Sequence, residues 1–172
     1  MHHLHLLRHA KSDRNEAVED HERPLSRRGR EAARRVAESL PAALGALDLV
    51  LCSTALRTRE TAALVLTGFV APPCVLYEDG LYLAGRAMLL RRLRGLDESA
   101  GAVMVIGHNP GLHELALALA SPDSPRYQAL ATGKFPTTAR ASFAIEGPWS
   151  SLGEARHQLT QYVTAKSLGD QG

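Results

Sequence analysis

The sequence predicts an α/β protein, a three-layer α/β/α sandwich with a mostly parallel central sheet. Two observations lead to this fold class. Short apolar runs rich in Val, Ile and Leu alternate along the chain with stretches whose apolar residues recur at helical spacing. The 172 residues, 45% of them hydrophobic, suffice for one well-packed core. We therefore expect a single compact domain over residues 1–172, without a large lid insertion.

Five segments are expected to form strands. The first four are continuous apolar runs, which are typical of strands covered by helices on both faces of a sheet. Cys52 ends the second run and is interpreted as a core residue. In chain order the expected strands are 3–7, 47–52, 74–77, 102–107 and 141–147.

Four helices are expected between and after these strands. The first begins after Ser26, whose hydroxyl is placed to cap the helix N-terminus, and its apolar residues share one face. The fourth begins after Pro110 and has a similar apolar stripe. The chain beyond about residue 165 is expected to fray. The expected helices are 27–40, about 55–67, about 86–95, and a fourth with Leu112, Leu115, Ala116 and Leu119 as its stripe.

Composition narrows the classes of function. A formal net charge of +2 and the lack of a long basic block argue against nucleic-acid binding. The arginines between residues 27 and 35 share their stretch with Glu31 and Glu38, so this stretch is interpreted as a solvated helix face. Two cysteines, no apolar run approaching 18 residues and no visible signal peptide favour a cytoplasmic protein without a membrane span. These features leave the oligomeric state unknown.

Residues capable of catalysis follow three of the expected strands. Arg8 and His9 end the first, Arg57 lies in the first turn after the second, and His108 follows the fourth. Ligands of open α/β sheets bind outside the carboxyl ends of the strands, so we expect these four side chains to converge. Arginine binds phosphate through paired hydrogen bonds, and histidine can act as nucleophile, general base or metal ligand. The pattern therefore indicates chemistry on a phosphate group.

Other kinds of site fit the sequence less well. A metal site would need acidic or further histidine ligands near His9 and His108, whereas the two arginines would repel a cation. The segment QALATGKF lacks the first glycine and the hydroxyl residue of a phosphate-binding P-loop. Counting from Cys52, the position where a cysteine-dependent phosphatase needs arginine holds Thr58. The G-x-S-x-G elbow of a serine hydrolase is absent.

Four ordered segments resemble motifs of the histidine phosphatase (phosphoglycerate mutase-like) superfamily. LLRHAKSDRN resembles its Arg-His-Gly motif, with Ala10 where many members have glycine, and DHERPLSRRGREAA looks like the segment that follows. CSTALRTRETA is similar to the segment with the second arginine, and VIGHNPGL matches the second histidine. The segments RHAKSD, ERPLS, GHNPGL and KFPTTA resemble the SixA-like phosphohistidine phosphatases in particular. The likeness covers about residues 3 to 145.

The resemblance implies a phosphatase that forms a covalent intermediate. His9 would be the nucleophile, and Arg8, Arg57 and His108 would hold the phosphoryl oxygens and neutralise their charge in the transition state. Asn15 would add a hydrogen bond to the phosphoryl group. Neither a metal nor another cofactor is expected, because cationic side chains supply the charge.

The general acid of the superfamily has no clear counterpart. Other members use Glu or Asp after the third strand, where Glu78 and Asp79 lie, and Asp13 on the first loop is a further candidate. All three are equally compatible with solvated loop carboxylates or helix-capping partners. The expected substrate is a phosphorylated protein carrying phosphohistidine, since no segment between Cys52 and Ile106 is long enough to form a lid. A small phosphorylated molecule as substrate, or a non-catalytic phosphate-binding module, is the alternative.

Overall fold

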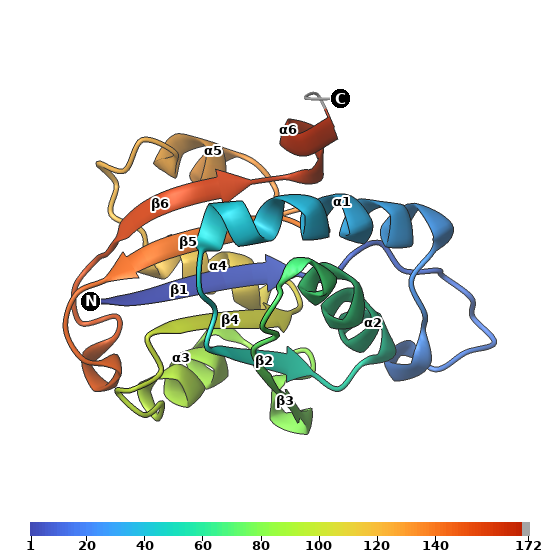
Figure 1. The fold of residues 1–172 in the computed structure, drawn as a ribbon, viewed down its shortest axis with the longest axis horizontal. Helices are drawn as coiled ribbons and strands as arrows, with labels where there is room; N and C mark the ends of the chain where they lie inside the picture. Colours follow the sequence, from blue (N-terminus) through green and yellow to red (C-terminus); the bar gives the residue numbers. More distant parts are fainter. Residues whose placement is uncertain (170–172) are drawn as a thin grey trace.

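The computed structural model describes residues 1–169, which form one central sheet of six strands (Figure 1). The strands lie side by side in the order β3-β2-β4-β1-β5-β6. β1 to β4 run parallel to one another, whereas β5 is antiparallel to β1, and β6 to β5. The prediction of a mostly parallel sheet is confirmed. The strands are β1 (His2–Arg8), β2 (Leu49–Ser53), β3 (Cys74–Glu78), β4 (Ala102–Gly107), β5 (Arg140–Ile145) and β6 (Gln158–Val163).

Helices cover both faces of the sheet and so complete the predicted three layers (Figure 1). On one face lie α1 (Arg27–Leu44) and α2 (Leu56–Val65), and on the other α3 (Arg86–Arg94), α4 (Gly111–Leu119) and α5 (Tyr127–Thr132). Ser26 caps α1 as predicted, since its Oγ accepts a hydrogen bond from the Gly29 amide (3.0 Å). α1 runs beyond the expected end at residue 40, because its last turn accommodates Pro41 and the helix ends at Gly45, with φ of +68°.

The alternation of side chains along β1 separates two apolar cores. Leu4 and Leu6 pack towards α3 and α4, whereas Leu7 packs towards α1 and α2. All three side chains are fully buried. The predicted stripe of α4 is buried as well, and consists of Leu112, Leu115, Ala116 and Leu119. Because both faces of β1 are covered, its polar residues at the carboxyl end stand on a rigid base.

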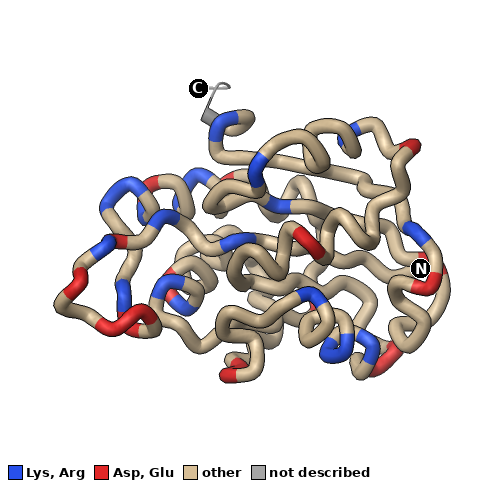
Figure 2. Tube along the Cα trace, turned by 180° about the vertical axis from the view of Figure 1, so that it is seen from behind, with Lys and Arg blue, Asp and Glu red and all other residues tan. Residues whose placement is uncertain are grey.

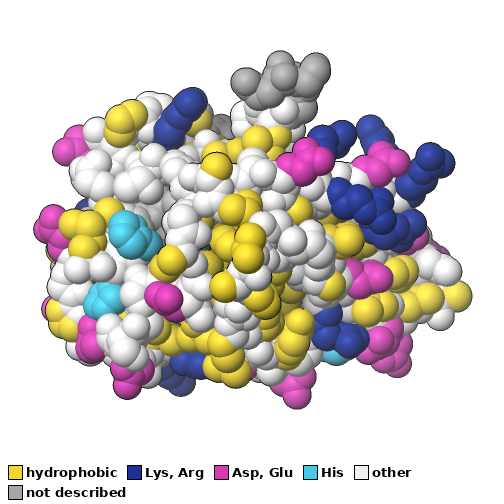
Figure 3. Space-filling view, in the orientation of Figure 1, with side chains coloured by type: hydrophobic (Ala, Val, Ile, Leu, Met, Phe, Trp, Pro, Cys, Tyr) yellow, Lys and Arg dark blue, Asp and Glu magenta, His cyan; other side chains and the backbone are white. Residues whose placement is uncertain are grey.

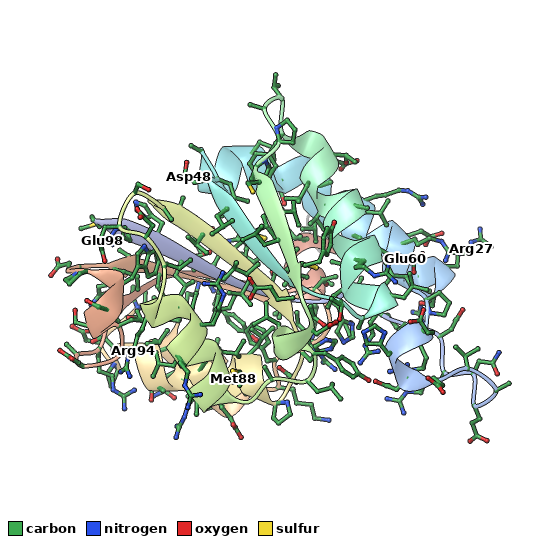
Figure 4. The ribbon with its side chains drawn as sticks, turned by 90° about the horizontal axis from the view of Figure 1, so that it is seen from below. Arg27, Asp48, Glu60, Met88, Arg94 and Glu98 are labelled. Carbon is green, nitrogen blue, oxygen red and sulfur yellow. The ribbon has the colours of Figure 1, made fainter. Side chains whose placement is uncertain are left out.

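The carboxyl ends of β1, β2 and β4 meet at one edge of the sheet. Arg8 pairs with Gly107 and Cys52 pairs with Ile106, so the three strands end nearly level with one another. In Figure 4, Arg27 and Glu60 lie towards this edge, and Glu98 lies at the opposite end of the strands. Residues that directly follow these strands are therefore brought together by the sheet itself.

Two features of the sheet differ from the sequence-based expectation. β3 is an edge strand on which Leu76 and Tyr77 are 41% and 49% exposed, so the prediction that this apolar run is covered on both faces is wrong. β6 lies outside the expected elements because QLTQYV mixes polar and apolar residues and contains no continuous apolar run. β6 and the short α5 extend the sandwich beyond β5.

The surface of α1 bears out the interpretation of its arginine-rich stretch. Arg28, Arg34 and Arg35 are exposed, and cationic side chains gather at one end of this face (Figure 3). Arg27 forms an ion pair with Glu31 one helical turn away (3.3 Å). The stretch is thus a solvated face of α1.

The C-terminal tail, expected to fray from about residue 165, forms the short helix α6 (Ala165–Gly169). Leu168 packs against the core on the α1 face. Residues 170–172, which also belong to the expected frayed tail, lie outside the described residues. Among residues 1–169, no helix has the length and apolarity needed to cross a membrane.

Candidate active site

A cavity of about 810 Å³ opens at the carboxyl ends of the parallel strands. Arg8 is the last residue of β1 and His9 follows it, His108 follows β4, and Arg57 lies in the first turn of α2 after β2. All four side chains line the cavity, and the ring centroids of His9 and His108 lie 5.3 Å apart. The structure therefore brings together the four residues that the sequence predicts to share a site.

The ring of His9 is held in one tautomer by the backbone. Nδ1 lies 2.7 Å from the carbonyl oxygen of Ala10, which can only accept a hydrogen bond, so Nδ1 carries the proton and Nε2 the lone pair. Burial lowers the pKa of His9 to about 4; the Ala10 carbonyl opposes this shift, and the charges of Arg8 and Arg57 add to it. His9 is thus neutral at pH 7, with Nε2 free to act as a nucleophile.

The guanidinium group of Arg8 is held by the segment that follows α5. Its NH1 donates a hydrogen bond to the carbonyl oxygen of Phe135 (3.1 Å), which also accepts one from the side-chain amide of Asn109 (2.7 Å). Burial, together with the nearby charge of Arg57, lowers the pKa of Arg8 from its ordinary value. A phosphate dianion bound by both guanidinium groups would relieve this repulsion.

Arg57 is oriented by Asp20, a residue of the loop between β1 and α1. Its NH1 donates to the backbone carbonyl of Asp20 (2.8 Å), and its NH2 donates to the carboxylate (3.1 Å). That carboxylate also accepts hydrogen bonds from the hydroxyl of Tyr82 and from Arg23. The bond from Tyr82, followed by the charge of Arg57, lowers the pKa of Asp20 to about 2. Asp20 is therefore an ionised anchor for Arg57.

The two ring nitrogens of His108 have different surroundings. Nε2 lies 2.8 Å from Oγ of Ser53, and Nδ1 lies 3.4 Å from NH2 of Arg57. Ser53 is fully buried, and its Oγ, which has two lone pairs, also accepts a hydrogen bond from the Ala55 amide (3.3 Å). Burial, and then the proximity of His9 and Arg57, lowers the pKa of His108 to about 3. A guanidinium group can only donate, so Nδ1 accepts the bond from Arg57, and the proton of this neutral ring is on Nε2, which donates it to Ser53.

The structure does not bring the other candidate residues into the lining of the cavity. They are Asn15, Asp13, Glu78 and Asp79. The first two lie on the exposed loop after β1, where Oδ1 of Asn15 accepts a hydrogen bond from the Ala17 amide (3.0 Å) and closes a local turn. The substrate contact that the resemblance implies for Asn15 is therefore not part of this geometry.

The two carboxylates after β3 are engaged elsewhere. Glu78 forms a two-point ion pair with Arg92 of α3, with both oxygens at 2.8 Å. Asp79 accepts a hydrogen bond from the hydroxyl of Thr54 (2.7 Å). Neither carboxylate is placed to give a proton to a leaving group in the cavity.

Three residues that shape the site lie outside the expected set. They are Asp20, Tyr82 and Phe135, which orient Arg57 and Arg8 as described above. The sequence signal that could have identified Asp20 is its place at the start of the segment DHERPLS. Across the described residues 1–169, no group of three or more His, Cys, Asp or Glu side chains is arranged to hold a metal ion.

Comparisons with known proteins agree with this geometry. The family model for the histidine phosphatase superfamily (branch 1) matches residues 4–79, which contain Arg8, His9 and Arg57. An uncharacterized protein of Mycobacterium tuberculosis is 36% identical over 149 residues, which cover 85% of this chain and 91% of the relative.

Two solved structures, each named as a candidate phosphohistidine phosphatase SixA, are similar over nearly the whole chain. The one from Nakamurella multipartitia is 31% identical, with a TM-score of 0.82 and 95% of both chains covered. The one from Agrobacterium tumefaciens is 26% identical, with a TM-score of 0.79, and the match covers 95% of this chain and 97% of the other. The likeness thus extends past residue 79 and covers nearly the whole chain. The chain belongs to the histidine phosphatase superfamily, and within it is SixA-like.

Proposed function

We propose that the protein is a metal-independent phosphatase that removes phosphate from phosphohistidine in proteins through a covalent intermediate on His9. Membership of the histidine phosphatase superfamily supports phosphatase activity, and the SixA-like relatives support a phosphorylated substrate. The choice of phosphohistidine as substrate rests on the ionisation of Asp20. Within residues 1–169 it is the only carboxylate that lines the cavity.

The first step transfers the phosphoryl group to the enzyme. The second ring nitrogen of the substrate histidine takes a proton from solvent, the lone pair on Nε2 of His9 attacks phosphorus, and the N–P bond of the substrate breaks so that a neutral imidazole departs. Arg8, Arg57 and His108 hold the phosphoryl oxygens and neutralise their charge in the transition state. In the second step water attacks phosphorus, the bond to Nε2 breaks, and inorganic phosphate leaves while one proton passes to solvent.

The leaving group decides which phosphate compounds this site can cleave. A phosphate ester of an alcohol expels an alkoxide, which needs a proton from a positioned acid. With a pKa of about 2 and three bonded partners, Asp20 is ionised at pH 7 and cannot supply that proton. Phosphohistidine can take a proton from solvent on its second ring nitrogen and then expels a neutral imidazole, a weak base whose conjugate acid has a pKa of about 6.5 and which needs no further proton. The site therefore favours cleavage of N–P bonds over O–P bonds of alkyl esters.

A substrate panel tests this function. The panel contains a histidine-phosphorylated protein, a phosphoserine peptide and a simple alkyl phosphate. We expect kcat/KM to be highest for the phosphohistidine protein by at least about a hundredfold, since the other two lack a leaving group that can depart unaided. Alkyl esters as the better substrates would instead identify a small-molecule phosphomonoesterase. Tight phosphate binding without turnover of any substrate would identify a binding module.

Carboxylate substitutions should have small effects on phosphohistidine turnover. Asp13→Asn, Glu78→Gln and Asp79→Asn are each expected to lower kcat by less than about tenfold, or 1.4 kcal/mol, because none of the three reaches the cavity. Steady-state kinetics with a phosphohistidine protein measures this. A substitution among the three that abolishes turnover would reveal a general acid and contradict the proposal.

Asp20→Asn separates an anchoring role from an acid role. Losing the ionic partner of Arg57 should slow turnover of phosphohistidine and of p-nitrophenyl phosphate by similar factors. A general acid would instead matter more as the leaving group becomes more basic, so aryl phosphates with a range of leaving groups are compared in both proteins. An effect that grows with leaving-group basicity would assign Asp20 as the acid.

The pH dependence of kcat/KM should report the low pKa of His9. Protonated His9 has no lone pair on Nε2, so activity is lost as the pH falls through about 4, and the nucleophile stays neutral between pH 5 and 8. The measurement uses p-nitrophenyl phosphate, whose leaving group departs without a proton, and rates are corrected for the dianionic fraction of the substrate. An acidic limb near pH 6.5 that remains after this correction would contradict the low pKa described for His9.

A further inference from the structure

We propose that the mouth of the cavity is a docking surface for a protein segment in which acidic and apolar side chains flank the phosphohistidine. This inference rests on the proposed function and names the kind of sequence that the site recognises. The surface, called the rim below, comes from three separate segments: the loop after β1, the turn before α3 and the segment after α5. It consists of Lys11, Arg14, Leu83 and Lys134.

The three cations of the rim are available to a ligand. Lys11, Arg14 and Lys134 are exposed, and their side chains form no hydrogen bond or ion pair with any of residues 1–169. Arg23, by contrast, is bonded to Ser12 and Asp20. The loop between β1 and α1 also carries acidic residues (Figure 2), but Asp20 is the only one that lines the cavity. The three rim cations therefore lie around the phosphoryl site but are not among the residues proposed to transfer the phosphoryl group.

Leu83 places an apolar side chain among these charges. It is 54% exposed and has φ of +51°, a left-handed conformation that is unfavourable for leucine. Both neighbours are fixed: the ring of Tyr82 packs edge-on against His108 (5.5 Å between centroids), and Ala84 touches the start of α4. A Cβ at Gly111 would lie only 2.0 Å from the carbonyl oxygen of Ala84, so this contact requires glycine. The fixed neighbours hold Leu83 at the cavity mouth.

These features fit a peptide segment better than a small molecule or a nucleic acid. A single phosphoryl group is already matched by Arg8, Arg57 and His108, so the rim cations would bind further anionic groups. The exposed side chain of Leu83 is removed from water only by an apolar partner, which a nucleic-acid backbone does not offer. A protein segment supplies both kinds of contact: Asp or Glu beside the phosphohistidine provides the anionic groups, and an aliphatic residue provides the apolar partner of Leu83.

Matched phosphohistidine peptides test the docking surface. Two peptides of equal length carry one phosphohistidine and one leucine, flanked by glutamates in the first and by lysines in the second; free phosphohistidine has the same bond without flanks. We expect kcat/KM to be about tenfold higher for the glutamate peptide at low ionic strength, with a difference that shrinks as salt is added. Lys11→Glu and Lys134→Glu should reduce or reverse this preference. Arg35→Glu, the same charge change on the exposed face of α1, should leave it unchanged.

Leu83→Asn tests the apolar contact while preserving the backbone, because asparagine tolerates the left-handed conformation. We expect kcat/KM to fall about threefold to tenfold for both peptides, with less than a twofold change for free phosphohistidine. Equal hydrolysis of the two peptides by the wild type, or an unchanged preference in both lysine variants, would overturn the docking surface. Turnover of free phosphohistidine in that case would leave the proposed function standing. Failure to hydrolyse any of the three would contradict both.

Discussion

Replacing His9 with alanine should abolish turnover of phosphohistidine, with kcat lower by about 10⁴-fold or more, equivalent to about 5 kcal/mol. The loss follows from the geometry. The Ala10 carbonyl holds the proton of the His9 ring on Nδ1, so Nε2 carries a free lone pair close to Arg8 and Arg57. Arg8, Arg57 and His108 remain in the variant, so phosphate should still bind. Steady-state kinetics combined with phosphate binding distinguishes the loss of a nucleophile from the loss of the fold.

His113→Gln is the matched control for this substitution. Its ring also lines the cavity, but Nε2 donates a hydrogen bond to the Leu130 carbonyl (2.9 Å) and the ring stacks on Phe135. We expect a loss of less than about tenfold, because no nitrogen of this ring takes part in phosphoryl transfer. Near-normal activity of His9→Ala, or equal losses in the two variants, would refute His9 as the nucleophile.

Arg57→Ala should cost far more activity than Arg59→Ala, although both arginines lie in the first turn of α2. Arg57 is buried and lines the cavity, whereas Arg59 is exposed and donates to the backbone carbonyl of Thr54 (2.9 Å). Residues two apart lie about 200° around a helix, so only one of them can face the site. Losing a charge-assisted contact in the transition state should cost about 2–4 kcal/mol, or roughly thirtyfold to a thousandfold in kcat/KM.

Arg57→Lys adds a test of geometry to this comparison. A lysine keeps the charge but lacks the planar fork through which NH1 and NH2 of Arg57 bind the carbonyl and the carboxylate of Asp20. It should therefore restore only part of the activity that alanine loses. Equal effects of Arg57→Ala and Arg59→Ala in parallel kinetic assays would show that the phosphoryl group is not bound on this face of α2.

Most of the fold was predictable because its strands are local, continuous apolar runs. β1, β2 and β4 are central strands, and burial on both faces leaves an unmistakable pattern such as LHLL or AVMVI. β3 has a similar composition but lies at the edge of the sheet. The order of the strands depends on contacts between residues far apart in the sequence, and the composition of a single strand does not reveal these contacts. β6 mixes polar and apolar residues over six positions without a regular period, a weak signal near the end of the chain.

The four central site residues were predictable for a related reason. Each directly follows a recognisable strand, and a parallel sheet gathers such positions at one edge. Asp20 and Tyr82 have no such marker: Asp20 bonds to Arg57, 37 positions away, and to Tyr82, 62 positions away. Neither residue lies in a periodic segment. Only the tertiary structure shows that the anchor of Arg57 comes from the loop after β1, and that Glu78 pairs with α3 instead.

The phosphoenzyme itself gives the most direct test of the central claim. The protein is mixed with a histidine-phosphorylated protein, quenched with base within milliseconds, digested and examined by mass spectrometry for phosphate on its own peptides. We expect an acid-labile, base-stable phosphate on the peptide that contains His9, appearing before inorganic phosphate and absent from His9→Ala. Release of inorganic phosphate with no phosphorylated enzyme at any time, or with phosphate on another residue, would contradict covalent catalysis by His9.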